Sequence, residues 1–155
     1  MVRIETDFTS FKIGLIEATF KTEVASVEGM KEAVLAFMDD SLHEPPACPR
    51  KSGSLAGSHS AFVNGQLIAT SESEYIEGGE GPTPLMSLTK VSRGIEGALI
   101  AHKSYAAAQH EGISRGGGVH AYSTSGTGRK WIESKLLRHG EKYLEMIAGR
   151  IRRAK

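Results

Sequence analysis

The sequence contains little cysteine, few aromatic residues and no long hydrophobic run. Cys48 is the only cysteine among 155 residues, which excludes an internal disulfide and a metal site built from several cysteines. No segment approaches the roughly 18 consecutive apolar residues that a membrane helix needs, and the N-terminal residues lack the apolar core of a signal peptide. We therefore expect a protein that is made in the cytosol, does not enter a membrane, and keeps Cys48 as a small, inert side chain.

The net charge of +1 conceals an uneven distribution along the chain. Residues 129–155 contain nine Lys or Arg and three Glu, whereas the first 128 residues contain ten basic and fifteen acidic residues. Such opposite signs suit head-to-tail contact between copies of the chain, or a basic end that faces nucleic acid. A solvated helix face with a basic tail explains the same pattern.

Length and composition indicate one globular domain over residues 1–155. A chain of this length can bury a core, and its 24% charged and 39% hydrophobic residues are typical of folded proteins rather than disordered ones. We expect the α+β class, with a long N-terminal helix and a C-terminal helix packed on a small antiparallel β-sheet of about four strands.

Apolar residues recur at helical spacing over residues 8–42 and predict one long helix. At about 1.5 Å per residue it would be roughly 50 Å long. It would then extend beyond its own domain, and its apolar stripe would invite a neighbouring subunit. Gly29 could instead divide it into two helices. Pro45, Pro46 and Pro49 require the helix to end before the first of them.

The pair Asn64-Gly65 predicts a tight hairpin, because both residues of a type I′ turn need a positive φ. We expect its two strands at residues 55–63 and 66–75. Weaker strand patterns lie at residues 2–6, 85–91 and 95–102.

Residues rich in glycine and small polar side chains predict two exposed loops, at 77–84 and 112–128. Loops of this length are commonly functional, and we expect both to be mobile in the free chain and to order on assembly. The alanine-rich stretch 104–110 predicts one or two turns of helix. A C-terminal helix is expected from about Lys130, with one apolar face formed by Ile132, Leu136, Tyr143, Ile147 and Ile151. Trp131, in its first turn, suits either the core or a contact between subunits.

The joint between the first helix and the hairpin, residues 49–58, carries a recognisable pattern. Gly53 and Gly57 permit backbone angles that are closed to other residues, and Leu55 is the first apolar residue that can fill the joint. The pattern Pro-x-x-Ser-Gly-x-Leu-x-x-Ser is formed by Pro49, Ser52, Gly53, Leu55 and Ser58. After a long helix, this pattern resembles a family of tailed-phage neck and tail-completion (minor tail) proteins.

Two later segments are similar to the same family, in the same order. Tyr105-Ala106 followed by Glu111-Gly112 resembles the Tyr-Ala…Glu-x-Gly element that closes the family's sheet and precedes its variable loop. Residues 128–132, around Trp131, take the place of the family's Pro-Phe-Leu and the start of its last helix.

The chain also departs from the family pattern. His110-Glu111-Gly112 replaces the commoner Glu-aromatic-Gly, Arg129-Lys130 stands where proline is usual, and residues 77–94 exceed a minimal link between strands. The departures concern the loop geometry and the contacts within a ring.

The resemblance covers residues 8–153 and implies a structural virion protein without enzymatic activity, cofactor or metal. It implies a homomeric ring, of six or twelve copies, that completes or joins the tail at the head–tail junction. Its neighbours would be the portal or connector and the tail-tube or tail-terminator proteins, with DNA passing through the lumen. The protein would be found in the virion and, during assembly, in the host cytoplasm.

A nucleic-acid-binding module is the alternative from a different class. Its phosphate contacts would come from five residues that are also candidates for an interface between subunits: Arg129, Lys130, Arg150, Arg152 and Arg153. The low aromatic content of 6% and the lack of helix-turn-helix spacing make this the weaker hypothesis.

Three further chemical hypotheses have less support. His102, His110 and His120 are eight and ten residues apart, unlike the ligand pairs of zinc sites, and we expect surface or interface histidines; His59 is expected on the strand surface. A serine hydrolase would need serine at the centre of G-x-S-x-G, where this chain has Leu55. The segment 126–130 could hold a phosphate at a helix start, although it lacks the Walker pattern.

Overall fold

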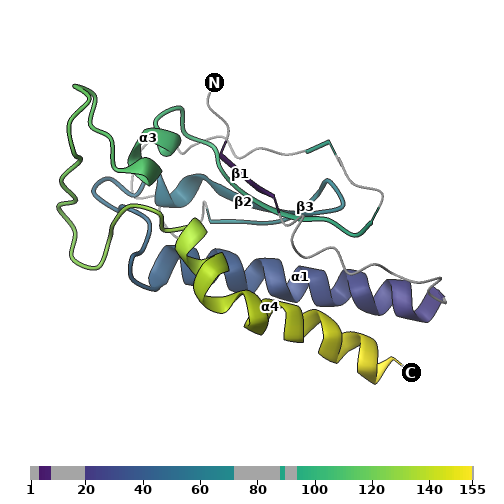
Figure 1. Cartoon of the computed structure of the whole chain (residues 1–155). Helices are drawn as coiled ribbons and strands as arrows, with labels where there is room; N and C mark the ends of the chain where they lie inside the picture. Colours follow the sequence, from purple (N-terminus) through teal and green to yellow (C-terminus); the bar gives the residue numbers. More distant parts are fainter. Residues whose placement is uncertain (1–3, 8–19, 72–87, 90–93, 155) are drawn as a thin grey trace.

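The computed structural model describes residues 4–7, 20–71, 88–89 and 94–154 (Figure 1). Two helices lie side by side in one layer, and a small antiparallel sheet lies against them (Figure 1). The elements in chain order are β1 (Ile4–Asp7), α1 (Phe20–His43), the short 3-10 helix η2 (Ala56–Ser58), β2 (His59–Val63), β3 (Gln66–Thr70), β4 (Gly97–Ala101), α3 (Ala106–Glu111) and α4 (Glu133–Arg153). The predicted α+β class, with an N-terminal and a C-terminal helix on a small antiparallel sheet, is confirmed.

Helix α1 ends at His43, before the prolines, as predicted. It continues without interruption through Gly29, so the alternative of two helices divided at this residue is wrong. Gly29 instead lies where the two long helices meet, since a Cβ placed on it would be 2.7 Å from the Ile147 Cα in α4. The first part of the predicted helix, residues 8–19, and the overhang that depends on it lie outside the described residues.

The sheet has the strand order β1-β4-β2-β3, with all neighbours antiparallel. The predicted hairpin forms β2 and β3, but residues 56–58, predicted in its first strand, form the 3-10 helix η2 instead. The turn residues have the expected positive φ, 52° at Asn64 and 79° at Gly65. The asparagine side chain also fastens this turn to the sheet, because its Oδ1 accepts the Glu96 N–H at 3.1 Å. Of the strand predicted at 85–91 the structure describes only Leu88 and Thr89, and neither is in a strand.

Strands β2 and β4 are buried along their whole length. The core on the helical side contains Phe37 of α1 together with Ala61 and Leu99 of the sheet, while Phe62 and Ile100 form a smaller cluster with other neighbours. Because both faces of β2 are covered, its residues do not alternate between core and solvent. The expectation that His59 lies on the strand surface is therefore wrong, since this residue is 0% exposed.

Strand β4 is followed by α3, the short helix predicted at 104–110. It ends at Gly112, which has a left-handed φ of 74°. The predicted loop 112–128 contains no helix or strand, but single bridges join Ile113 to Val119 and Thr127 to Ala47. The loop predicted at 77–84 lies outside the described residues, and the mobility expected of both loops stays a prediction.

Helix α4 runs antiparallel to α1 and presents the predicted apolar face to it (Figure 1). Tyr143 and Ile147 are buried, and Leu136 and Ile151 pack against the same core. Trp131 is 0% exposed and belongs to the core, so it is not the subunit contact considered above.

Cys48 is buried as expected, and burial raises the pKa of its thiol. Within the described part of the chain, no helix combines the length and the apolar character needed to cross a membrane.

Candidate functional site

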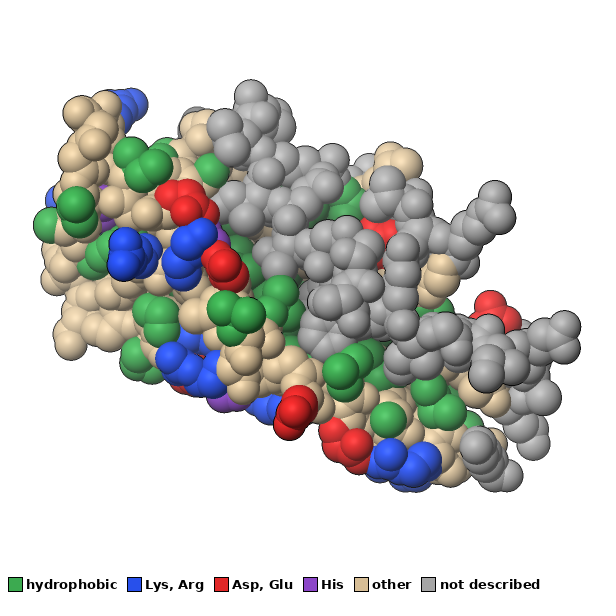
Figure 2. Space-filling model, viewed as in Figure 1, with side chains coloured by type: hydrophobic (Ala, Val, Ile, Leu, Met, Phe, Trp, Pro, Cys, Tyr) green, Lys and Arg blue, Asp and Glu red, His purple; other side chains and the backbone are tan. Residues whose placement is uncertain are grey.

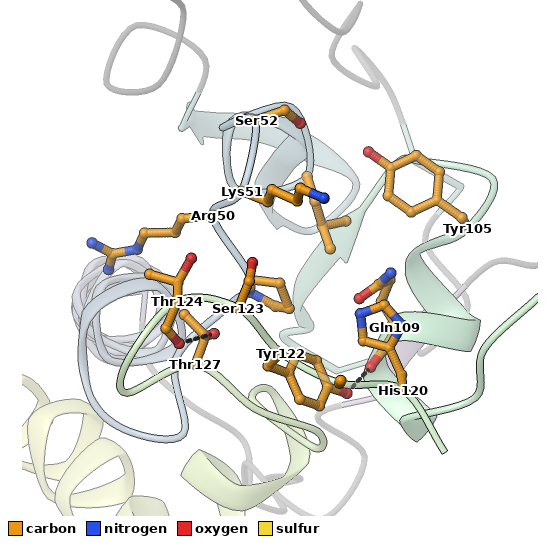
Figure 3. A pocket seen from close by; sticks show the side chains of 13 residues that line it. Arg50, Lys51, Ser52, Tyr105, Gln109, His120, Tyr122, Ser123, Thr124 and Thr127 are labelled. Carbon is orange, nitrogen blue, oxygen red and sulfur yellow. Dashed lines mark hydrogen bonds between the residues drawn. The ribbon is translucent and has the colours of Figure 1, made fainter. Parts of the chain in front are cut away.

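A pocket of about 260 Å³ lies between the joint after α1, helix α3 and the following loop (Figure 3). Its walls come from three segments that are far apart in the sequence. They are formed by Pro49, Arg50, Lys51, Ser52 and Leu55, by Tyr105 and Gln109, and by His120, Ala121, Tyr122, Ser123, Thr124 and Thr127. Four residues picked out by the sequence patterns, Pro49, Ser52, Leu55 and Tyr105, thus share one cavity.

The joint is shaped by the remaining residues of its pattern. Gly53 has a φ of 70°, a conformation that favours glycine, and its carbonyl accepts the Gly57 N–H at 2.7 Å. The Ser58 hydroxyl donates to the Leu55 carbonyl at 2.7 Å and is itself buried. Leu55 fills the joint as expected, being 4% exposed and part of the core. The pattern therefore describes a tight turn that places Pro49 and Ser52 at the pocket.

The opposite wall of the pocket is held by hydrogen bonds that no sequence pattern predicts. The Tyr122 hydroxyl donates to the Gln109 carbonyl (Figure 3), and the rings of Tyr122 and His120 meet edge to face with centroids 4.9 Å apart. Thr127 donates its hydroxyl to the Thr124 carbonyl at 2.7 Å. The Gln109 Oε1 atom is buried and accepts no hydrogen bond from the described residues. No motif marked these residues, because only the fold brings them together.

Among the described residues, two cationic side chains and no carboxylate line the pocket. Arg50 directs its guanidinium to the Leu42 carbonyl at the end of α1, where a cation also complements the helix dipole. Lys51 is exposed and forms no ion pair with any residue that the structure describes. In Figure 3 its ammonium extends toward Tyr105 across the pocket. The electrostatics of the pocket therefore favour an anionic group.

The two later segments of the resemblance also meet. The Lys130 Nζ is 2.8 Å from Glu111 Oε2 and 2.8 Å from Glu133 Oε2, and the hydrogen bond from Lys130 lowers the pKa of Glu111. Gly112 packs against Arg129, whose Cβ would lie 3.3 Å from a Cβ on the glycine. Ala106, the first residue of α3, is fully buried and belongs to the larger hydrophobic core. Since Lys130 is held by two carboxylates, the phosphate site considered at 126–130 has little support.

Beneath this contact, two histidines are buried around the single tryptophan. Trp131 Nε1–H donates to His59 Nε2 at 3.3 Å, and His59 Nδ1–H donates to the Ala56 carbonyl at 3.1 Å. This arrangement requires the neutral imidazole, and burial lowers the pKa of His59 to about 4. The His110 ring packs edge to face on Trp131 at 4.8 Å, and burial lowers its pKa as well. The expectation of a surface or interface role is wrong for His110, which is 5% exposed.

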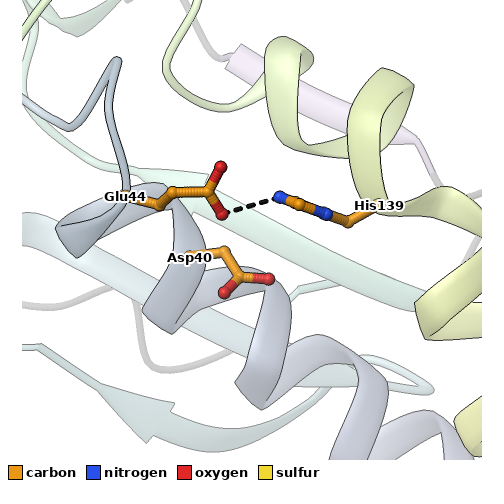
Figure 4. A group of neighbouring side chains, drawn as sticks. All are labelled: Asp40, Glu44 and His139. Atoms are coloured by element: carbon orange, nitrogen blue, oxygen red, sulfur yellow. Dashed lines mark hydrogen bonds and ion pairs between the residues drawn. The ribbon is translucent and has the colours of Figure 1, made fainter.

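A different group has the composition of a metal site, and the sequence patterns had not marked it. Asp40, Glu44 and His139 place potential ligand atoms within 4.8 Å of one another where α1 ends beside α4 (Figure 4). None of His102, His110 and His120 belongs to a group of this kind among the described residues.

The carboxylates of this group are already bound by cations. Glu44 pairs with His139 at 2.6 Å and with Arg138 at 2.8 Å, and Asp40 accepts from Lys142 at 2.8 Å and from the Tyr143 hydroxyl at 2.7 Å. Partial burial raises the pKa of Asp40, but these hydrogen bonds outweigh it and the net shift is downward. We interpret the group as a set of ion pairs and hydrogen bonds that connects α1 to α4.

The basic end of α4 is largely paired within the chain. Arg150 donates to Glu32 of α1 through its Nε at 2.8 Å, and Arg152 pairs with Glu145. Arg153 and Arg129 form no ion pair with the described residues. Basic and acidic groups accordingly lie next to each other along the helical layer (Figure 2).

Comparison of the chain with protein-family models, with curated proteins and with solved structures gave no match.

Proposed function

We propose that this protein is a structural subunit of a tailed-phage virion. It would form a homomeric ring of six or twelve copies at the head–tail junction and complete or join the tail there. Its neighbours would be the portal or connector on one side and tail-tube or tail-terminator proteins on the other, with DNA in the lumen. In this role the chain performs no bond-making chemistry.

The observation that carries the proposal is the convergence of the segments on which the resemblance rests. The joint pattern and Tyr105 line one pocket although about 50 residues of sequence separate them. Glu111-Gly112 and Arg129-Lys130 lie against each other through an ion pair and close packing. Patterns that are far apart in the chain and meet in the fold support a shared architecture better than patterns that remain scattered.

The kind of constraint on these residues also supports a scaffold rather than a catalyst. Gly53 and Gly112 adopt positive φ, while Leu55, Ser58, Ala106 and Trp131 are buried. Each of these residues has a structural reason for its identity. Two exposed residues of the same patterns, Ser52 and Tyr105, line the pocket.

The decisive experiment counts copies of the chain in an assembled particle. Reconstruction of the neck by electron microscopy should place six or twelve copies in a closed ring between capsid and tail. A copy number unrelated to the ring symmetry, or a chain absent from purified virions, would contradict the proposal.

Hydrogen exchange of the free and assembled chain gives a second prediction. The amides of residues 114–125 should exchange rapidly in the free chain, because few backbone hydrogen bonds cross this loop. They should become protected by about tenfold or more on assembly, together with those of residues 77–84. Helix α4 serves as the internal control and should be protected in both states. Full protection of both loops in the free monomer would be inconsistent with ordering on assembly.

Nucleic-acid binding through the C-terminal helix remains the alternative, with weaker support. Three of its five expected phosphate contacts, Lys130, Arg150 and Arg152, are engaged by carboxylates of the same chain.

A further inference from the structure

We propose that the pocket between the joint, α3 and the 120–127 loop is a docking site for an acidic peptide segment of a second copy of this chain, residues 72–80. This inference rests on the proposed ring, in which every copy offers both a pocket and a segment to its neighbours. It adds the contact that would link one copy to the next.

The pocket selects for negative charge at its rim. Lys51 extends over it without an ion pair to the described residues, and no Asp or Glu of these residues lines it. The hydroxyls of Ser52, Ser123 and Thr124 add further donors for a carboxylate. A carboxylate placed beside Lys51 would form a charge-assisted hydrogen bond in a partly enclosed site, where such bonds are stronger than in open solvent.

The interior of the pocket favours a peptide over a simple anion. Pro49 and Leu55 provide apolar surface, and the rings of Tyr105 and Tyr122 provide flat contact area. The buried Gln109 Oε1 lacks a donor among the described residues, and an unsatisfied buried acceptor is costly. A fully ionised inorganic anion offers no donor for this atom, whereas a peptide offers backbone N–H groups together with its carboxylates. A nucleic acid would need several cations to contact its phosphates, and Lys51 alone offers fewer such contacts.

The sequence of the chain itself supplies a matching segment. Residues 72–80 contain four glutamates, Glu72, Glu74, Glu77 and Glu80, and no Lys, Arg or His occurs from 72 to 87. The aromatic and apolar residues between them suit the apolar surface of the pocket. The segment follows Ser71, which is fixed to the fold because its hydroxyl donates to the Ala56 carbonyl. Charge and composition thus pair this segment with the pocket of another copy.

The first experiment measures binding of a synthetic peptide of residues 71–81 to the full chain by NMR titration. We expect saturable shifts at Lys51, Tyr105, Gln109 and His120, and binding that is about tenfold weaker or more to Lys51→Glu. The affinity of Lys51→Gln, which removes the charge without reversing it, should lie between that of the unmodified chain and that of Lys51→Glu. Arg115→Glu makes the same charge change at an exposed residue that does not line the pocket and should bind like the unmodified chain. Equal affinity for all four proteins, or shifts confined to other residues, would overturn the inference.

The second experiment tests whether the segment comes from another copy. One variant carries Lys51→Glu, and the other replaces all four glutamates of residues 72–80 by lysine. Neither should self-associate in sedimentation at concentrations where the unmodified chain does. An equimolar mixture should associate, because the pocket of each variant is then complementary in charge to the segment of the other. Absence of mixed complexes would mean that the pocket is filled within one chain. Binding of a single-stranded oligonucleotide to the same pocket more tightly than the 71–81 peptide would indicate a nucleic-acid site. Either result contradicts the inference.

The outcome can be separated from that of the proposed function. If the neck ring is found but Lys51→Glu assembles normally, the docking site is wrong and the ring stands. If the peptide binds and mixed complexes form while the chain is absent from virions, the docking site stands and the virion role is wrong.

Discussion

The imidazole of His59 links the strand β2 to the only tryptophan of the chain. It donates to a backbone carbonyl through Nδ1 and accepts the Trp131 indole N–H through Nε2. The contact with Trp131 requires the neutral ring, because a protonated Nε2 has no lone pair to accept the indole N–H. Complete burial gives protonation a further high cost. The pKa of about 4 in the folded chain, compared with 6.5 for an unperturbed histidine, expresses this cost.

The stability of the protein should therefore fall as the pH is lowered from 6.5 to 4. Because the His59 pKa is lower in the folded chain than in the unfolded one, the unfolded chain binds more protons in this window. The contribution to the free energy of unfolding is fully present above pH 6.5 and is lost as the pH approaches 4, on the order of 3 kcal/mol in all. Urea unfolding followed by Trp131 fluorescence at several pH values measures this slope.

The comparison with His59→Gln isolates this residue from other titrating groups. The variant should be less stable at pH 7, but its stability should depend less steeply on pH between 4.5 and 6.5. Other groups with lowered pKa, such as His110 and Glu111, titrate in both proteins and cancel in the comparison. A slope unchanged by the substitution would show that His59 does not carry the pH dependence.

Helices α1 and α4 approach each other closely where Gly29 faces Ile147. A Cβ on Gly29 would lie 2.7 Å from the Ile147 Cα and 3.2 Å from its carbonyl oxygen. These are backbone atoms, which cannot rotate out of the way. The absence of a side chain at residue 29 is therefore a condition for the observed helix spacing.

Gly29→Ala should destabilise the protein by about 1–3 kcal/mol, because the helices must separate to admit a methyl group. The gain in helix propensity, about 1 kcal/mol, opposes this loss and is included in the range. Gly149→Ala in α4 is the matched control. Its Cβ would approach no atom closer than 3.7 Å, so the substitution should stabilise by about 0.5–1 kcal/mol.

Thermal unfolding of the unmodified chain, Gly29→Ala and Gly149→Ala measures these changes in stability. Opposite signs for the two substitutions would support the close approach at residue 29. Stabilisation by both would show that the helices are further apart than described.

At the scale of the molecule, the opposite charges of the two long helices are largely balanced in space among the described residues. The acidic α1 runs antiparallel to the basic α4, so that Glu32 meets Arg150 and Asp40 meets Lys142. Exposed pairs of this kind contribute little to stability. They do, however, reduce the number of cations available to an external polyanion.

We expect the isolated chain to bind DNA weakly and with a shallow dependence on salt. The double variant Glu32→Gln with Glu145→Gln releases Arg150 and Arg152, and should steepen the slope of log affinity against log salt by about one to two phosphate contacts. Fluorescence anisotropy with a labelled duplex between low and moderate salt measures this slope.

A control of equal net charge distinguishes local release from a general charge effect. Glu23 and Glu141 are exposed and form no ion pair with the described residues, so replacing both by glutamine should change the slope less than the first pair does. Steep salt dependence of the unmodified chain would instead favour the nucleic-acid hypothesis.

The sequence by itself determined those turns, helix ends and helix faces whose patterns lie within a short stretch of the chain. Asn64-Gly65 specified the hairpin because few other residue pairs adopt its positive φ angles. Pro45 fixed the end of α1, and the regular spacing of Tyr143 and Ile147 fixed the buried face of α4. The joint pattern likewise located one wall of the pocket, because Gly53 and Leu55 constrain the turn within a few residues.

Only the tertiary structure decided what depends on contacts between distant segments. The low helix propensity of Gly29 suggests a helix break. In the structure, however, this residue permits the close contact between α1 and α4, which no local pattern encodes. His59 suggests a strand surface by alternation, but β2 is covered on both faces and the ring is buried against Trp131. The pocket itself arises where Pro49, Tyr105 and Thr127 converge. Chain geometry sets local turns and helix ends, whereas burial and the partners of each side chain are set by packing across the whole fold.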